Sequence, residues 1–321
     1  MDYYGLVNKF KLNRPLNVFE ACHRLHPSKS VFDKPWGARS VIKMNSTYLE
    51  CVDKFFEDKG VMSTVGLYSM GAFIIAGIIL IFPTINDLPD HTPEKKTEAL
   101  YFIAFMAFIV TAVVTSSCFF LRKEFFRLTH YPIRFNRKNR MVYVFLLNGT
   151  VMAESWDKLF FTEGECGGRL IGYGEIRDVR VHRLAEDGET VLDTFALPEF
   201  SDVSYTYRFA FWEFVRRYME EGPEKLMCRV PMINDVADRR ETFLAGWNRH
   251  HIAAVTNTSL WFACLFSPLT FLFATSRWLA VRTCKIPVWP TEVEAACQVD
   301  PKDPYIIDRD HPPVAVDRMD S

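Results

Sequence analysis

Residues that could ligate a metal lie close together at one point of the sequence, Cys22-His23-x-x-His26. A thiolate and imidazoles are ligands that zinc accepts. The spacing matches no standard zinc site, however, and no second pair of ligands stands out elsewhere in the chain. The eight cysteines form no C-x-x-C pair, and their scatter is typical of free thiols in a reducing compartment. We therefore predict no metal centre.

Motifs of common catalytic and nucleotide-binding sites are absent from the sequence, including G-x-S-x-G, H-E-x-x-H and the G-x-x-x-x-G-K-[ST] phosphate loop. Gly164, Gly167 and Gly168 have no neighbouring Lys and Ser/Thr pair, so we interpret them as a loop before a short strand over residues 169–173. His250-His251 precedes an apolar run and is interpreted as a basic interfacial anchor. These observations predict a protein that is not an enzyme and holds no cofactor.

Basic residues are concentrated between residues 122 and 140, where the only acid is Glu124. This basic cluster consists of Arg122, Lys123, Arg127, Arg134, Arg137, Lys138 and Arg140. A basic stretch can bind nucleic acid, but the net charge of the chain is −1 and the cluster directly follows an apolar run. Lys and Arg beside a membrane span fix its orientation and contact anionic lipid head groups. We predict that role, with the lipid bilayer as partner and no nucleic acid.

Two apolar runs, residues 60–86 and 99–121, precede the basic cluster on either side of a polar loop at 84–98. Each exceeds the roughly 20 residues that a helix needs to cross the hydrocarbon core of a bilayer. We predict a transmembrane hairpin over residues 60–121, with spans at about 63–83 and 100–121. The loop has two Lys, far fewer basic residues than follow the second span, so the loop is predicted outside and both flanking segments in the cytoplasm.

The spans contain no Asp, Glu, Lys, Arg or His. Ion pathways and proton relays usually need such residues within the membrane, so a pump or transporter is disfavoured.

Residues 122–227 are predicted to form a cytoplasmic α+β domain. Asn148-Gly149 lies between two β-rich arms, which predicts a hairpin with a type I′ turn. Asp187-Gly188 predicts a second hairpin in the same way. A helix over residues 205–221 then presents one apolar face and stops at Gly222-Pro223. The predicted fold is therefore a set of antiparallel hairpins closed by an amphipathic helix.

The other segments give weaker patterns. Residues 1–59 are predicted to be a cytoplasmic N-terminal segment with a helix over 46–58, which Asn45 or Ser46 could cap. Residues 228–251 are predicted to be a linker, helical from residue 236, and residues 252–281 a third membrane segment with Pro268 near its centre. Basic residues flank that segment on both sides, so it could span or be re-entrant, and we favour a span. The acidic, Pro-rich tail over 282–321 is predicted to be disordered in its last 15 residues.

The order of hairpins and helix resembles a pleckstrin-homology-like module. The segments YPIRFNRKNRMVYVF, GTVMAESWDKLFF and WEFVRRYMEEGPEKL resemble those of an uncharacterised family of proteobacterial membrane proteins, a domain of unknown function, over roughly residues 65–280. Genes of that family often lie beside type VI secretion effectors. The resemblance implies a multi-pass protein of the bacterial inner membrane, and it supplies no catalytic residues.

Two functions follow as expectations. The first is a non-enzymatic integral membrane interaction protein with a protein partner, as an immunity or accessory protein for a type VI secretion effector. The alternative is a lipid- or ligand-sensing, membrane-anchored module whose basic cluster recognises anionic lipid. An enzyme or transporter of unrecognised type is the third and least favoured class.

Overall fold

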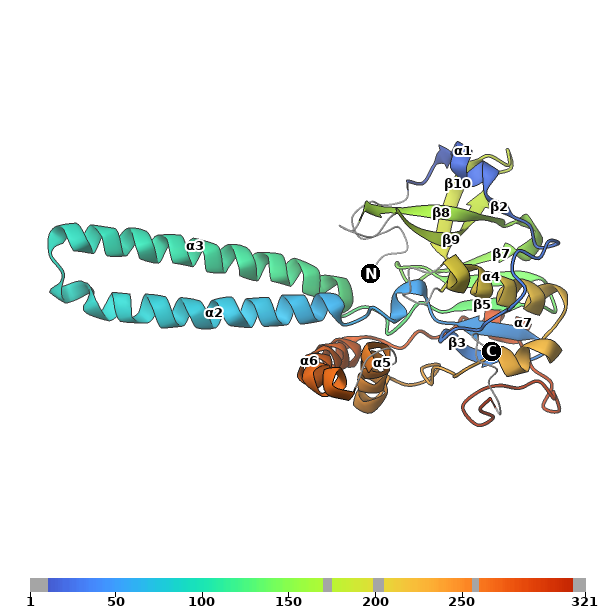
Figure 1. Cartoon of the computed structure of the whole chain (residues 1–321). Coiled ribbons are helices and arrows are strands. Elements are labelled where there is room, and N and C mark those ends of the chain that lie inside the picture. The colour runs from blue at the N-terminus through green and yellow to red at the C-terminus, as the bar shows by residue number, and fades with distance from the viewer. Residues whose placement is uncertain (1–10, 170–174, 199–204, 256–259, 314–321) are drawn as a thin grey trace. The chain divides into compact units, whose positions relative to one another are not determined.

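The computed structural model describes residues 11–169, 175–198, 205–255 and 260–313 (Figure 1). The chain forms two compact units, each assembled from separate segments. Unit 1 contains residues 1–57, 128–239 and 286–321, and unit 2 contains residues 58–127 and 240–285. The N-terminal segment and the tail therefore belong to the same unit as the predicted α+β domain.

The first sheet of unit 1 is a five-stranded antiparallel meander. Its strands, in order, are β3 (Val41–Met44), β4 (Tyr48–Cys51), β5 (Ile133–Asn136), β6 (Met141–Phe145) and β7 (Val151–Ser155). Strands β4 and β5 are neighbours, with Cys51 opposite Ile133. The two long apolar helices of unit 2 are thus inserted into the connection between two paired strands.

The second sheet of unit 1 is also antiparallel and five-stranded. Its order is β1 (Arg14–Pro15), β10 (Thr190–Ala196), β9 (Glu175–Leu184), β8 (Phe160–Arg169) and β2 (Arg24–Leu25). The hairpin predicted around Asp187-Gly188 is confirmed as β9 and β10. The loop predicted at Gly164–Gly168 is wrong, because these glycines continue β8, which pairs with β9 across a register shift. The short strand expected at 169–173 falls largely on residues 170–174, outside the described residues.

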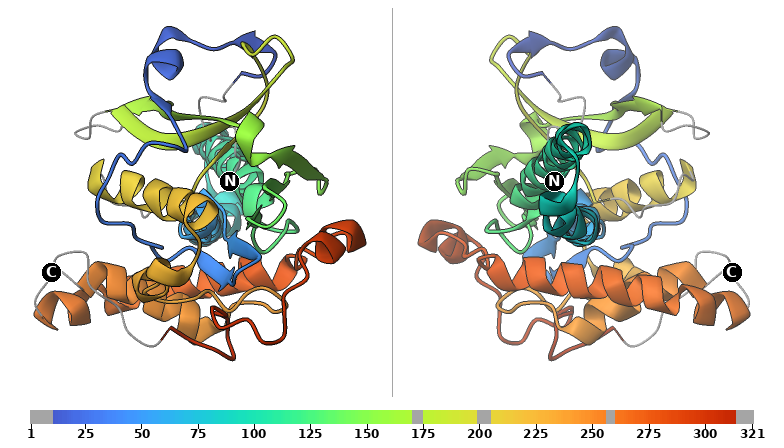
Figure 2. Two further views of the ribbon diagram at one scale, coloured as in Figure 1. Left: turned by 90° about the vertical axis from the view of Figure 1, so that its right-hand side faces the viewer. Right: turned by 90° about the vertical axis from the view of Figure 1, so that its left-hand side faces the viewer.

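Helix α4 (Tyr205–Glu220) lies between the two sheets (Figure 2). Trp212 of α4 is fully buried, and its ring centroid lies 5.9 Å from that of Trp156 and 4.7 Å from that of Phe161. The helix ends where predicted, since the N–H of Gly222, with a φ of +98°, bonds back to the carbonyl of Arg217. The aromatic rings of both sheets and of α4 thus form one core.

The hairpin predicted around Asn148-Gly149 is confirmed as β6 and β7, but its turn is of a different type. Only Gly149, and not Asn148, has a positive φ, of +84°. The N–H of Gly149 donates to the carbonyl of Leu146, and the side chain of Asn148 accepts from Thr150. This is a type I turn followed by a left-handed glycine, the common geometry of a three-residue hairpin loop.

Gly149→Val should therefore lower the free energy of unfolding by about 1 kcal/mol, since a β-branched residue resists a positive φ. The site is otherwise open, because nothing lies within 4 Å of the position of an added Cβ. Gly149→Asn is the matched control and should cost less, because Asn tolerates the left-handed region. Denaturant unfolding of the full-length protein measures both, and equal stabilities of the two variants would contradict the strain argument.

The N-terminal segment and the tail both complete unit 1. The helix predicted over 46–58 is wrong: β4 and a short 3₁₀ turn (Lys54–Phe56) lie there instead. The side chain of Asn45 accepts from the N–H groups of Thr47 and Tyr48, so it stabilises the β3–β4 turn rather than capping a helix. In the tail, Met44 and Ile307 exchange two backbone hydrogen bonds. Residues 314–321 lie outside the described residues.

Unit 2 contains the antiparallel helices α2 (Val61–Asp87) and α3 (Pro93–Glu124), which are both long and apolar enough to cross a membrane (Figure 1). The polar loop predicted at 84–98 is mostly helical: α2 continues through Pro83, and α3 starts with Pro93 at its first position. The unit also contains α5 (Phe243–Val255) and α6 (Leu260–Thr283). Helix α5 begins later than predicted, since the side chain of Thr242 caps it.

Candidate functional site

The structure divides the basic cluster between the two units. Arg122 and Lys123 occupy the last turn of α3, and Arg127 follows it, all within unit 2. The side chains of Arg122 and Arg127 are exposed. Positive charge at the C-terminus of a helix is favoured by the helix dipole, and its place at the end of an apolar helix suits contact with head groups. These three residues keep the features that the interfacial prediction requires.

Arg134, in unit 1, is buried instead. Its Nη2 lies 2.8 Å from Glu50 Oε2 and 3.1 Å from Glu294 Oε1. Its guanidinium also stacks over the rings of Tyr48 and Trp289. A buried ion pair of this kind holds strands and tail together and leaves Arg134 no access to lipid.

The remaining members of the basic cluster lie at the β5–β6 turn of unit 1. Arg140 has a φ of +53°, and its Nη2 lies 2.5 Å from Asp157 and 3.0 Å from Glu220. Arg137 is half-buried and Lys138 is exposed. The seven basic residues thus have different contacts, and only some of them are exposed enough to bind lipid head groups.

The candidate metal ligands of the N-terminal segment do not converge. Cys22 and His26 are exposed, and His23 stacks on Phe19, with its Nδ1 2.9 Å from the Phe19 carbonyl. Among the residues that the structure describes, no group of three His, Cys, Asp or Glu side chains could hold a metal ion. His251 packs against Trp247, and the side chain of His250 lies outside the described part.

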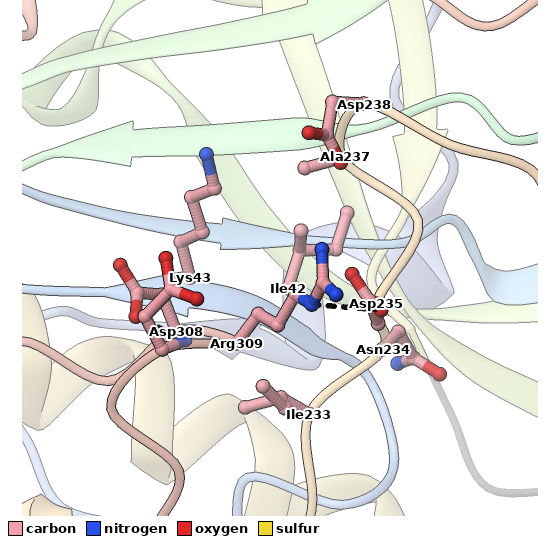
Figure 3. A pocket seen from close by; sticks show the side chains of 10 residues that line it. Ile42, Lys43, Ile233, Asn234, Asp235, Ala237, Asp238, Asp308 and Arg309 are labelled. Atoms are coloured by element: carbon pink, nitrogen blue, oxygen red, sulfur yellow. Dashed lines mark hydrogen bonds and ion pairs between the residues drawn. The ribbon is translucent and has the colours of Figure 1, made fainter.

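A shallow hollow on unit 1 gathers acidic side chains (Figure 3). Its lining consists of Ile42, Lys43, Ile233, Asn234, Asp235, Ala237, Asp238, Asp308, Arg309 and Asp310. Arg309 reaches across to Asp235, at 3.6 Å. The carboxylate of Asp308 accepts from the N–H groups of Asp310 and His311 and so belongs to its own turn. This lining includes no hydroxyl, thiol or imidazole, and its charged groups are the amine of Lys43, the guanidinium of Arg309 and four Asp carboxylates.

The outer edge of β7 is a candidate binding feature of unit 1. Strand β7 is the last strand of its sheet and pairs with β6. Hydrogen bonds join Leu146 to Thr150 and Trp156 to Arg140, so the bonded pairs fall at the even-numbered positions of β7. The backbone groups of Val151, Ala153 and Ser155 therefore point away from the sheet. Ala153 is exposed, whereas the N–H of Ser155 donates to Glu154 Oε1 at 2.9 Å, so the part of this edge that is open to another strand is centred on Ala153.

The glycines of α2, which could have formed a contact surface for a partner helix, are largely used within unit 2. Gly66 and Gly77 are buried against α3, where an added Cβ would lie 3.0 Å from Leu121 and 2.9 Å from Val110. Gly71 has nothing within 4 Å of that position. Small residues thus allow close packing of α2 on α3, as is typical of helices in membranes.

A buried charge cluster in unit 2 was not found from the sequence. Glu241 accepts from Arg249 at 3.0 Å and from Arg277 at 2.5 Å, and Arg277 also donates to the carbonyl of Lys59 at 2.7 Å. Burial opposes ionisation of Glu241, but the charges of Arg277 and Arg249 outweigh it and lower its pKa to about 2. In the sequence, Glu241 is the only acid between Arg239 and Arg277, which flank an apolar segment, and this pattern could have revealed the charge cluster.

Comparison with known proteins gives a family without a known activity. A family of unknown function (DUF6708) matches residues 108–301, more than half of the chain. The match contains part of α3, strands β5 to β10, and helices α4 to α7, of which α7 is Thr291–Ala296. No curated protein and no solved structure matches the chain.

Proposed function

The chain belongs to the DUF6708 family of unknown function, and we propose that it is a membrane-anchored binding module that acts by holding a protein partner, without turnover of its own. In this proposal α2 and α3 cross the inner membrane of a bacterium, and unit 1 lies on the cytoplasmic side. Their length and apolar composition support the crossing. The excess of basic residues after α3 supports the orientation.

The open edge of β7 carries the proposal. An exposed strand edge can pair with an extended segment of another protein, in which main-chain hydrogen bonds give affinity and alternate side chains give specificity. Natural proteins usually block such edges with charges, bulges or proline. Ala153 at the centre of β7 is small and exposed, and its N–H and C=O groups point outward in the plane of the sheet. The backbone groups of Val151 and Ser155 point the same way, although the N–H of Ser155 already donates to Glu154 Oε1 at 2.9 Å.

The proposed type of module and the proposed protein partner both follow from the resemblance to known families. The order of strands β5 to β10 followed by helix α4 supports a proposed resemblance to pleckstrin-homology-like modules, many of which bind protein strands or lipid heads. The proposed partner is a type VI secretion effector, with this chain as its immunity or accessory protein. Deleting the gene should then make cells sensitive to the adjacent effector, or unable to export it. A deletion strain indifferent to adjacent effectors would remove the secretion role and leave the binding module.

Ala153→Pro tests the binding edge directly. The N–H of Ala153 points away from β6, so proline removes no hydrogen bond of the sheet, and edge strands tolerate it there. We expect the variant to fold and its partner to be lost, because proline removes the central donor of the edge. A photo-crosslinker at Ala153 in the full-length protein, in its own cells, should give one discrete adduct.

The matched control is a crosslinker at Glu186, an exposed turn residue of the other sheet, which should give no such adduct. Retained thermal stability of Ala153→Pro together with an unchanged set of co-purifying proteins would contradict binding at this edge.

A further inference from the structure

Helix α6 carries an exposed apolar stripe along one side. The stripe consists of Trp261, Cys264, Leu265, Pro268, Leu269 and Leu272, and it continues to Leu279. These positions recur every three or four residues, so they lie on one face of the helix. The opposite face, with Thr270, Ala274 and Val281, is buried within unit 2. A stripe of this size on a helix needs apolar surroundings.

The tail limits how often the chain can cross a membrane. Residues after α6 return to unit 1, where Asn136 Nδ2 donates to the carbonyl of Ala296 at 2.8 Å and Ser46 N donates to Asp303 at 2.7 Å. If α2 and α3 both cross, the segments on either side of them lie on one side of the bilayer. The tail packs against both segments, so it lies there too. The number of crossings between residues 239 and 286 must therefore be even.

Two crossings by α5 and α6 are excluded by length. Helix α5 has 13 residues and is therefore about 20 Å long, whereas the hydrocarbon core is about 30 Å thick. Zero crossings remain. If α2 and α3 both cross, the span that we favoured from the sequence is incompatible with the packing of the tail, although α6 alone is long and apolar enough to cross.

The directions of the helices within unit 2 are consistent with zero crossings by α5 and α6. Helices α5 and α6 are seen nearly end-on in Figure 1, where α2 and α3 are seen lengthwise, and the relation is reversed in Figure 2. The crossing lies near the start of α2, where Tyr68 Oη is 3.3 Å from the carbonyl of Leu272. Gly60, with a φ of +104°, allows it, because a Cβ there would lie 2.7 Å from that of Arg277. Helix α6 thus lies across the direction of the hairpin.

We propose that α5 and α6 lie in the plane of the membrane, with the exposed stripe of α6 buried at the boundary between the head groups and acyl chains. The occupant of the stripe is the same bilayer that α2 and α3 cross, so this inference rests on the proposed membrane crossing. Trp261 is 86% exposed and Arg282 stacks on Trp278, which are the residue types that anchor helices at this depth. The chain then crosses the membrane twice.

Reporter fusions to the full-length protein test the count of crossings. A reporter after Ser321 should give the same signal as one at Glu186, and a reporter at Asp90, between α2 and α3, should give the opposite signal. A reporter after Ser321 that matches Asp90 would overturn the in-plane arrangement. Equal signals from Asp90 and Glu186 would instead overturn the crossing by α2 and α3, and with it the proposed function.

Spin labels on the protein in lipid vesicles measure depth independently. Leu265, Leu272 and Leu279 are seven residues apart on one face of α6, and we expect them to report equal depths. In a spanning helix Leu272 would lie about 10 Å deeper than the other two. That result would overturn the inference. Labels at Phe108 and Phe119 of α3 are the control: they lie about 16 Å apart along the helix, so in a crossing helix the label at Phe108 should report a clearly greater depth than the label at Phe119.

Discussion

Trp212→Ala should lower the free energy of unfolding of unit 1 by about 3–5 kcal/mol, a large part of the stability of an ordinary domain. The indole is fully buried, and it stacks on Trp156 with an interplanar angle of 21°. Trp156 in turn contacts Phe135 of β5 and Phe161 of β8, so the cavity would open where α4 meets both sheets. Close-packed aromatic neighbours collapse poorly into such a space, and the cost is therefore expected at the upper end.

Trp212→Phe separates the loss of volume from the loss of the ring. Within the described residues, Nε1 of Trp212 has no hydrogen-bond partner, so phenylalanine removes an unsatisfied donor while it keeps most of the aromatic packing. We expect a much smaller loss of stability for this variant. Denaturant unfolding of the full-length protein in detergent, followed by near-ultraviolet circular dichroism, measures both. An unchanged midpoint for Trp212→Ala would contradict the packing of α4 between the sheets.

Elements with strong local patterns could be predicted from the sequence. The lengths of the apolar runs predict α2 and α3, the two Asx-Gly pairs predict the β6–β7 and β9–β10 hairpins, and the apolar periodicity predicts α4. Local signals decide these elements because their partners are close in sequence or, for the long helices, because composition alone is sufficient. The turn at Asn148-Gly149 shows the limit: the pair predicts a hairpin, but the loop length decides the turn type.

Elements with distant partners could not be predicted. Tyr48–Cys51 pairs with β3 on one side, but its other partner, β5, comes only after the whole α2–α3 hairpin. Gly164 continues β8 because β9 pairs with it, although glycine is a poor strand former. The tail is acidic and rich in proline, but Trp289 and Ile307 are buried in unit 1. In each case a tertiary contact outweighs local propensity.

The candidate site likewise combines features that local sequence patterns predict with features that depend on distant contacts. An exposed sheet edge could be expected, but which strand ends the sheet depends on pairing across the inserted helices. The basic cluster predicts interfacial residues from charge density alone, and charge density does not reveal that Arg134 has Glu50 as a buried partner. The number of times that α6 can cross the membrane is inferred from the return of the tail to unit 1. Residues 252–281 alone do not reveal this contact.

Glu241→Ala should destabilise unit 2 by about 3–5 kcal/mol, because it leaves the guanidinium groups of Arg249 and Arg277 buried without their common carboxylate. Both Arg side chains are almost fully buried, so water cannot replace the lost partner. Arg277 also donates to the carbonyl of Lys59 just before α2, so the effect should extend to the attachment of α6. We expect faster amide hydrogen exchange in α5 and α6 of the variant, with β6 and β7 unchanged as the internal reference.

The pH dependence of stability tests the contribution of the charge of Glu241 separately from that of its shape. Its pKa is lowered from 4.5 to about 2 in the folded protein, because Arg277 and Arg249 outweigh the penalty of burial. A carboxyl with a lowered pKa contributes stability that is fully present above about pH 4.5, and this contribution is lost as the pH falls towards 2. Glu241→Gln keeps the shape but removes the charge, so its stability should vary less between pH 6 and pH 3 than that of the native protein. Parallel pH curves for the two proteins would mean that Glu241 carries no charge in the fold, and the two Arg side chains would then need another anion to hold α6 in place.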